Sequence, residues 1–246
     1  MDIKLLDFTV ISFDCYGTLI DWETGIWDAL QPLLAHGDST GISRRDALTA
    51  YGKLEHKHEA ETPQALYPDI LTRVHRDLAR EFGITSSASL DATFAGSVQL
   101  WPAFADTAEA LRILQSRFKL VILSNVDRQS FSASAMKLGV EFDALYLAED
   151  IGSYKPDDRN FDYLVEHVRQ DFNCEKPQLL HTAQSLLHDH QGANRHGIRN
   201  AWIDRQRLSE SGDWGATKAL ESWPVFDFQY FTMRELADAV LAEEMM

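Results

Sequence analysis

The chain of 246 residues is poor in cysteine, in basic residues and in long apolar runs. Its two cysteines, Cys15 and Cys174, cannot build a disulfide framework, which is typical of a protein of the reducing cytoplasm. Only 23 Lys and Arg stand against 38 Asp and Glu, a formal net charge of -15, whereas nucleic-acid binding needs clustered cations. No apolar run approaches the length of a membrane-spanning helix. We therefore expect a cytoplasmic protein that binds neither nucleic acid nor a membrane.

Acidity does not exclude a small anionic substrate, because a pocket can be locally positive inside an acidic protein. With 45% hydrophobic and 25% charged residues, the composition is that of an ordinary globular protein. A chain of this length can bury one large core, or a core that carries a smaller inserted domain. A homodimer is compatible with this size, although no surface patch in the sequence decides the oligomeric state.

Short, continuously apolar runs alternate with helical patterns along most of the chain. Continuous rather than alternating apolar character indicates strands buried on both faces, as in a parallel sheet. The predicted strands are Phe8–Phe13, Leu120–Leu123, Leu145–Ala148, Leu179–Thr182, Ala201–Ile203 and, with the weakest pattern, Phe226–Phe231. Predicted helices between them are Thr107–Arg117, Arg128–Leu138 and Asn160–Val168. This order predicts an α/β fold with a doubly wound parallel sheet.

The segment from about Thr24 to Gln99 departs from this alternation, because it contains helical patterns and no convincing strand. Its predicted helices are Trp27–Leu34, Arg44–His58, Ile70–Phe82 and Ser89–Leu100. We therefore predict a helical cap domain of residues 22–100, inserted after the first strand. Residues 1–21 and 101–246 would together form the core domain.

Polar side chains follow four of the predicted strands. Ligands of open α/β sheets bind outside the carboxyl ends of the strands, so these side chains should share one rim. They are Asp14 after the first strand, Ser124 and Asn125 after the second, Lys155 in the YKPD loop beyond the third, and Gln184, Ser185, His188 and Asp189 after the fourth. A nucleophilic carboxylate, a hydroxyl, a cation and a second acid would then meet.

The order DxYGT, SN, YKPD and a final small-residue and acidic loop resembles the haloacid dehalogenase superfamily over nearly the whole chain. The helical insertion after the first motif is part of the resemblance. It implies a Rossmann-like core, a mobile cap and a covalent aspartyl intermediate. Asp14 matches the nucleophile of that superfamily, Lys155 its lysine, and Thr18 and Ser124 its hydroxyl groups.

Two positions separate this chain from the phosphatases of the superfamily. The phosphatases share a second Asp two residues after the nucleophile and a metal-binding Asp in the last motif. This chain has Tyr16 at the first of these positions and Gln184 at the second. Tyr is a poor proton donor near neutral pH. A neutral amide also lacks the charge with which carboxylates hold magnesium. The resemblance therefore favours attack on carbon, with no metal ligand and no cofactor.

The DxYGT motif, together with YKPD and WIDR, resembles the L-2-haloacid dehalogenase branch. On that resemblance Asp14 displaces halide from C2 of an (S)-2-haloacid with inversion, and water then releases a D-2-hydroxy acid. Lys155 would keep Asp14 ionised, and Asp189, with His188, would orient or deprotonate the water. The expected substrate-binding residues are Tyr16, Thr18, Ser124, Asn125, Gln184, Ser185, His188 and Trp22, the last from its position alone.

Several positions depart from the dehalogenase pattern. Gly52 stands where those enzymes present a halide-binding Arg, and Phe161 stands where they carry a Tyr; Gln184 and His188 are departures in the last motif. Cations that could replace the missing Arg are Arg44, Arg45 and Lys53. Two alternatives therefore stay open: an atypical phosphatase of a small phosphorylated metabolite, and a non-catalytic binding protein on the same fold.

Some candidates also have plain structural interpretations. Asp189 fits equally well as the N-cap of a helix that begins near Gln191. Glu55 and Glu59 lie four residues apart on a helix and could face the cleft together, although surface placement is the default.

Four histidines invite a metal interpretation that the sequence does not favour. His188 and His190 are expected to be hydrogen-bonded or solvated, because no third soft ligand is evident. His56 and His58 are two apart on a predicted helix and cannot share a face, so solvent or the cap pocket is the expected surrounding.

Overall fold

The computed structural model describes residues 3–36, 41–210, 212 and 222–245. Within these residues the strands form a six-stranded, all-parallel sheet in the order β3-β2-β1-β4-β5-β6. The strands are β1 (Val10–Phe13), β2 (Lys119–Ser124), β3 (Ala144–Leu147), β4 (Leu179–Ala183), β5 (Arg199–Ile203) and β6 (Phe228–Tyr230). Each predicted strand overlaps one of them, and the predicted doubly wound α/β fold is confirmed.

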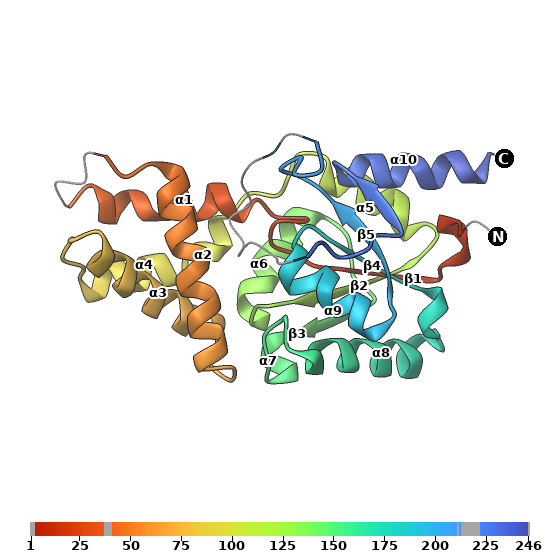
Figure 1. Ribbon diagram of the computed structural model, residues 1–246, viewed down its shortest axis with the longest axis horizontal. Coiled ribbons are helices and arrows are strands. Elements are labelled where there is room, and N and C mark those ends of the chain that lie inside the picture. The colour runs from red at the N-terminus through yellow and green to blue at the C-terminus, as the bar shows by residue number, and fades with distance from the viewer. Residues whose placement is uncertain (1–2, 37–40, 211, 213–221, 246) are drawn as a thin grey trace.

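Helices cover both faces of the sheet (Figure 1). One face packs against α5 (Thr107–Gln115), α6 (Arg128–Leu138) and α10 (Met233–Glu244), and the other against α8 (Asp158–Phe172) and α9 (Gln191–His196). The sequence of β2 is continuously apolar because both of its faces are buried. Leu120 and Ile122 belong to the hydrophobic cluster under α5, α6 and α10, and Val121 and Leu123 belong to the cluster under α8 and α9. Each such side chain, once buried, stabilises the fold by about 1.5–3 kcal/mol.

Between β1 and β2 the chain forms a helical cap beside the sheet (Figure 1). Its helices are α1 (Trp22–Leu34), α2 (Arg44–Glu61), α3 (Tyr67–Glu81) and α4 (Ala88–Ala95). The side chains of Asp21, Ser43 and Ser87 accept the first free backbone N–H groups of α1, α2 and α4, which explains where these helices begin. The inserted cap is confirmed, and its limits at residues 22 and 100 stay a prediction.

One predicted cap helix is interrupted. The pattern Ser89–Leu100 forms α4 and then a separate 3-10 helix, η2 (Ser97–Leu100). Gly96 lies between the two and caps α4 through its N–H, which donates to the carbonyl of Ala92. The remaining short elements are η1 (Leu5–Asp7), α7 (Ala148–Ile151), η3 (Lys176–Gln178) and a π-helical turn, η4 (Leu186–His190). Among the described helices, none is both long and apolar enough to span a membrane.

The two chain segments that connect cap and core are paired with each other. Ile20 forms an antiparallel bridge with Ala103, and the N–H of Asp21 donates to the carbonyl of Pro102. The fully buried Trp101 packs against Gly25 so closely that a Cβ at Gly25 would lie 2.3 Å from its ring. This pairing fixes where α1 leaves the core and so sets the position of the cap above the strand ends.

Candidate active site

Asp14 follows β1 directly and lies at the carboxyl end of the sheet, where the strand order reverses between β1 and β4. Beyond it the chain turns at Gly17, whose φ of 100° suits glycine. A Cβ at Gly17 would also meet Gln184 Oε1 at 2.9 Å and Trp22 Nε1 at 3.1 Å. The turn brings Thr18 Oγ1 to 2.8 Å from Asp14 Oδ2, to which it donates a hydrogen bond.

The Lys155 ammonium lies between two carboxylates. Its Nζ donates to Asp14 Oδ1 at 2.9 Å, to Asp189 Oδ1 at 2.7 Å and to the carbonyl of Leu123 at 2.8 Å, so its three donors are all used. Only 1% of Lys155 is exposed, and a buried charge persists when it is paired. Burial alone would lower the pKa of Lys155, but Asp14 and Asp189 together hold it above its usual value. Lys155 is therefore a fixed cation.

Asn125 holds the Lys155 loop in place from the end of β2. Its Oδ1 accepts the backbone N–H of Lys155 at 2.7 Å, and its Nδ2 donates to the backbone carbonyl of the same residue at 3.0 Å. The peptide bond between Lys155 and Pro156 is cis. The amide of Asn125 thus fixes the backbone from which the ammonium reaches Asp14.

Asp189 is the second acid on the Lys155 ammonium. Besides Lys155, its Oδ1 lies 2.9 Å from His181 Nε2, and His181 Nδ1 lies 2.9 Å from Ser12 Oγ. The other oxygen, Oδ2, is buried and has no hydrogen-bond partner among the described residues. The capping interpretation is wrong: the residue before α9 is His190, no side chain of the described residues caps that helix, and Asp189 contacts Lys155 instead.

The two acids differ in their pKa values. Burial raises the pKa of Asp14 and the nearby Asp189 adds to the rise, while Lys155 and Thr18 oppose it. Burial alone would likewise raise the pKa of Asp189, but Lys155 and His181 hold it well below its usual range. Asp189 is therefore ionised at neutral pH, and its Oδ2, which lacks a partner in the described chain, can accept a proton or a hydrogen bond from water.

His181 was not predicted as a site residue. It lies in β4 in the run LLHTA and is fully buried. The signal in the sequence was a titratable side chain inside an otherwise apolar strand, which has to be paired because an unpaired buried polar group is costly.

Arg205 of the WIDR motif is a second residue that was not predicted as part of the site. Its Nη2 donates to the carbonyl of Thr18 at 2.8 Å and its Nη1 pairs with Asp106 at 2.8 Å. It supports the turn that carries Thr18.

Tyr16 and Gln184 stand at the two positions where the resemblance to phosphatases would require an Asp. The Tyr16 hydroxyl lies 3.0 Å from Ser134 Oγ on α6, and its ring packs edge-on against Trp101. Gln184 donates from Nε2 to Gln206 Oε1 at 2.7 Å. Burial raises the pKa of Tyr16 well above its usual value. Neither position supplies a negative charge beside Asp14.

The remaining predicted residues lie in the same region; some of their polar atoms are hydrogen-bonded and others are not. Ser124 Oγ and His188 Nε2 are buried without a hydrogen-bond partner in the described chain. Ser185 Oγ accepts the backbone N–H of His188 at 3.1 Å and begins the π-helical turn. Burial lowers the pKa of His188 to about 4. Trp22 packs against Tyr51 at a ring separation of 5.6 Å.

Helix α2 brings two carboxylates toward these residues. Glu59 is only 3% exposed, and Asn125 Nδ2 donates to its Oε1 at 3.2 Å. Glu55 accepts hydrogen bonds from the hydroxyls of Tyr51 and Tyr67. Burial raises the pKa of both acids, well above the usual value for Glu59. The default surface placement is wrong, because Asn125 and the tyrosines supply hydrogen bonds that replace water.

The cations considered for halide binding lie elsewhere. Arg44 is exposed and donates to Thr24 Oγ1 at 3.1 Å, and Arg45 and Lys53 are exposed too. In the part of the chain that the structure describes, Lys155 is the cation whose side chain contacts Asp14. Phe161 lies in the core, where its ring fills the space beside Gly192: a Cβ there would lie 2.0 Å from it.

Residues 8–176 match the family of haloacid dehalogenase-like hydrolases, and the chain therefore belongs to that family. Among curated proteins none matches the chain.

Solved structures with a similar fold include L-2-haloacid dehalogenases. That of Xanthobacter autotrophicus is 17% identical with a TM-score of 0.76, covering 95% of this chain and 98% of its own. L-2-haloacid dehalogenase PA0810 is 21% identical with a TM-score of 0.73, covering 96% of this chain and 99% of its own. A magnesium-bound HAD-hydrolase, YfnB from Bacillus subtilis, is 18% identical with a TM-score of 0.73, covering 95% and 99%. At these identities the likeness shows the fold.

Proposed function

We propose that the protein hydrolyses an (S)-2-haloacid through an ester on Asp14, without a metal in the chemical steps. One observation carries the proposal: Tyr16 and Gln184 engage Ser134 and Gln206 and leave Asp14 with an ammonium as its counter-charge. A phosphate dianion would meet two buried carboxylates there without a divalent cation. A leaving halide, in contrast, needs neither a general acid nor a metal.

In the first step an oxygen of the Asp14 carboxylate forms a bond to C2 of the substrate. The bond between C2 and the halogen breaks, and its electron pair leaves with the halide. Lys155 and Thr18 each hold one oxygen of Asp14, which orients the carboxylate for attack. We assign the substrate carboxylate to the Ser124 hydroxyl, which has no hydrogen-bond partner among the described residues, and to the neighbouring backbone.

In the second step water attacks the carboxyl carbon of the Asp14 ester and gives up a proton to Asp189 Oδ2, the oxygen to which no described residue is hydrogen-bonded. The bond between that carbon and the ester oxygen then breaks. The departing oxygen takes up the remaining proton of the attacking water as the 2-hydroxy acid leaves, Asp14 returns as a carboxylate, and Asp189 releases its proton to solvent. Lys155 spans both steps because it contacts the nucleophile and the base. Trp22, beside Gly17 and Tyr51, would form the wall around the short acyl chain.

The test is halide release from each enantiomer of 2-chloropropionate, with and without EDTA. We expect turnover of the (S) enantiomer only, with kcat at saturating substrate unchanged by EDTA, and a covalent adduct on Asp14 by mass spectrometry. In the wild type, turnover in ¹⁸O-water should label the Asp14 carboxylate. Asp14→Asn should abolish both the adduct and turnover. The matched control is Asp143→Asn, because Asp143 precedes β3 at the amino end of the parallel sheet, whereas Asp14 follows β1 at the carboxyl end. Full turnover by Asp14→Asn would refute the mechanism.

An atypical phosphatase is the second candidate, favoured by a different observation. Glu55 and Glu59 bring two more carboxyl groups close to Asp14 and Lys155, and carboxylate oxygens are ligands that hard divalent cations prefer. Phosphate release from a small phosphate ester that requires magnesium and stops in EDTA, with no halide release from either enantiomer, would establish this candidate over the first.

A further inference from the structure

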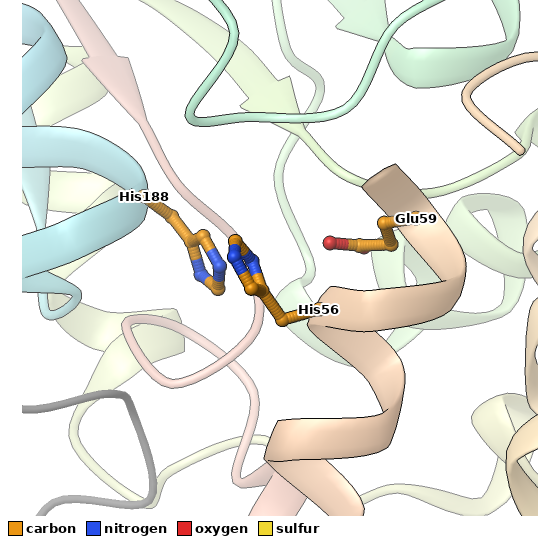
Figure 2. A group of neighbouring side chains, drawn as sticks. All are labelled: His56, Glu59 and His188. Atoms are coloured by element: carbon orange, nitrogen blue, oxygen red, sulfur yellow. The ribbon is translucent and has the colours of Figure 1, made fainter. Parts of the chain in front are cut away.

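Helix α2 of the cap and turn η4 of the core meet at three side chains (Figure 2). His56 and Glu59 belong to α2, one turn apart, and His188 belongs to η4. One potential ligand atom from each of them lies within 4.8 Å of the others. The imidazole rings of His56 and His188 face each other at a centroid separation of 5.8 Å.

Two histidines and a glutamate form a ligand set suited to a divalent transition metal. Zinc takes imidazole nitrogens at about 2.0–2.1 Å and carboxylate oxygens at about 2.0–2.2 Å in tetrahedral geometry. Ligand atoms around such an ion are roughly 3.4 Å apart. The separations present here, up to 4.8 Å, therefore have to close by about 1.4 Å or less, which rotation of side chains can provide.

His188 gives a second, independent indication of a ligand. Its Nε2 is buried and has no hydrogen-bond partner among the residues described, although buried polar atoms are nearly always satisfied. The backbone of His188 is fixed by the Ser185 side chain at the start of η4. Glu59 is fixed in turn by Asn125 on the core side. The backbone of His188 and the carboxylate of Glu59 are thus anchored, and rotation of side chains has to bring the three ligand atoms together.

We propose that His56, Glu59 and His188 bind one Zn²⁺-like ion, which ties the cap to the core at the mouth of the active site. Three protein ligands leave a fourth position for water or another small ligand. Because imidazole favours transition metals and magnesium prefers oxygen, the site should discriminate against Mg²⁺. It is separate from the Asp14 and Lys155 pair and does not require the proposed haloacid activity.

The connection to the active site is short. Glu59 receives a hydrogen bond from Asn125, which fixes the Lys155 loop, and His188 immediately precedes Asp189. An ion bound here therefore links the cap to Asn125 through Glu59, and to Asp189 through His188.

The direct test is Zn²⁺ binding to the full chain after removal of metals, measured by competition with a chromophoric chelator. We expect one ion per chain and at least a tenfold loss of affinity in each of His56→Ala, His188→Ala and Glu59→Gln. His36→Ala, which changes an exposed histidine at the end of α1, is the matched control and should leave affinity unchanged. A millimolar excess of Mg²⁺ should not displace Zn²⁺.

Two further measurements keep the outcome decisive. Co²⁺ should give the intense visible absorption of a tetrahedral site in the wild type and lose it in His56→Ala. Excess Zn²⁺ should raise the melting temperature of the wild type and not of His56→Ala, since an ion that binds the folded state stabilises it. Circular dichroism in EDTA establishes that each variant is folded, and His56→Ala, on a half-buried cap position, decides the matter if His188→Ala does not fold.

Absence of stoichiometric Zn²⁺ binding, or equal affinity in the wild type and His56→Ala, would overturn the proposal. Neither result bears on halide release by Asp14, so failure of the metal site and failure of the proposed function are distinguishable.

Discussion

Replacing Lys155 with Met removes the ammonium that lies between Asp14 and Asp189 while keeping most of the side-chain volume. Two charge-assisted hydrogen bonds, at 2.9 and 2.7 Å, and one to the Leu123 carbonyl at 2.8 Å are lost. Removing one member of a buried ion pair costs about 3–5 kcal/mol, because the remaining charge is left buried and unpaired. We expect the free energy of unfolding at pH 7 to fall by that amount.

The loss should depend on pH with a definite sign. Without Lys155 the pKa values of Asp14 and Asp189 in the folded state rise above their unfolded values, so both carboxylates destabilise the fold where they are ionised. Protonation as the pH falls through these raised values relieves the cost. The destabilisation of Lys155→Met should therefore be smaller at pH 5 than at pH 7.

Urea unfolding at both pH values measures this effect. The matched control is Lys119→Met, which removes an ion pair of similar length, 2.7 Å, between the exposed Lys119 and Asp143. Exposed pairs contribute about 0–1 kcal/mol, so the control should stay near the wild type. If the two variants lose the same free energy, the buried Lys155 does not have the role argued from its contacts.

Three other predictions follow from single contacts. Burial raises the pKa of Asp14, so kcat/KM for the haloacid should fall as the pH drops through an apparent pKa above the ordinary 3.8; an acid limb below 3.8 would contradict this. His181→Ala removes the hydrogen bond that holds Asp189 Oδ1, and a hydrogen bond to a charged group contributes about 1.5–3 kcal/mol. Hydrolysis of the ester should therefore slow about 10- to 100-fold, and the adduct on Asp14 should accumulate. Loss of adduct formation would instead assign His181 another role. Gly192→Ala places a Cβ 2.0 Å from the Phe161 ring and should cost about 1–3 kcal/mol in urea unfolding, while Gly96→Ala, with 3.5 Å of clearance, is the control that should differ little from the wild type.

The fold could be predicted from the sequence because burial leaves a local pattern. Strand β2 is apolar at four successive positions since it packs on both faces, and the segment between β1 and β2 repeats its apolar residues at helical spacing. Element ends were less predictable. The predicted helix Ser89–Leu100 ends early at Gly96, because a capping hydrogen bond depends on backbone geometry that periodicity does not report.

The site was predictable only where motif order carried the information. Asp14 and Lys155 are 141 positions apart in the chain, and the topology of a parallel sheet brings the ends of their segments to one rim. His181 and Glu59 have no such marker. Their burial depends on partners, Asp189 and Asn125, that lie on other elements. Periodicity indicates which face of an element is buried, whereas partner identity comes from packing between elements.

The charges of the cleft connect the two proposals. The carboxylates of Asp14 and Asp189 share the Lys155 ammonium, so an anionic substrate enters a region with more negative than positive charge. A divalent ion at Glu59 would reduce this repulsion, and binding linkage then requires coupling in both directions: the ion strengthens substrate binding, and the substrate strengthens ion binding by the same factor. Typical coupling of about 1–3 kcal/mol corresponds to roughly 5- to 150-fold. Equilibrium binding of (S)-2-chloropropionate to Asp14→Asn, with and without Zn²⁺, measures it, and equal affinities would show that the metal site and the substrate site act independently.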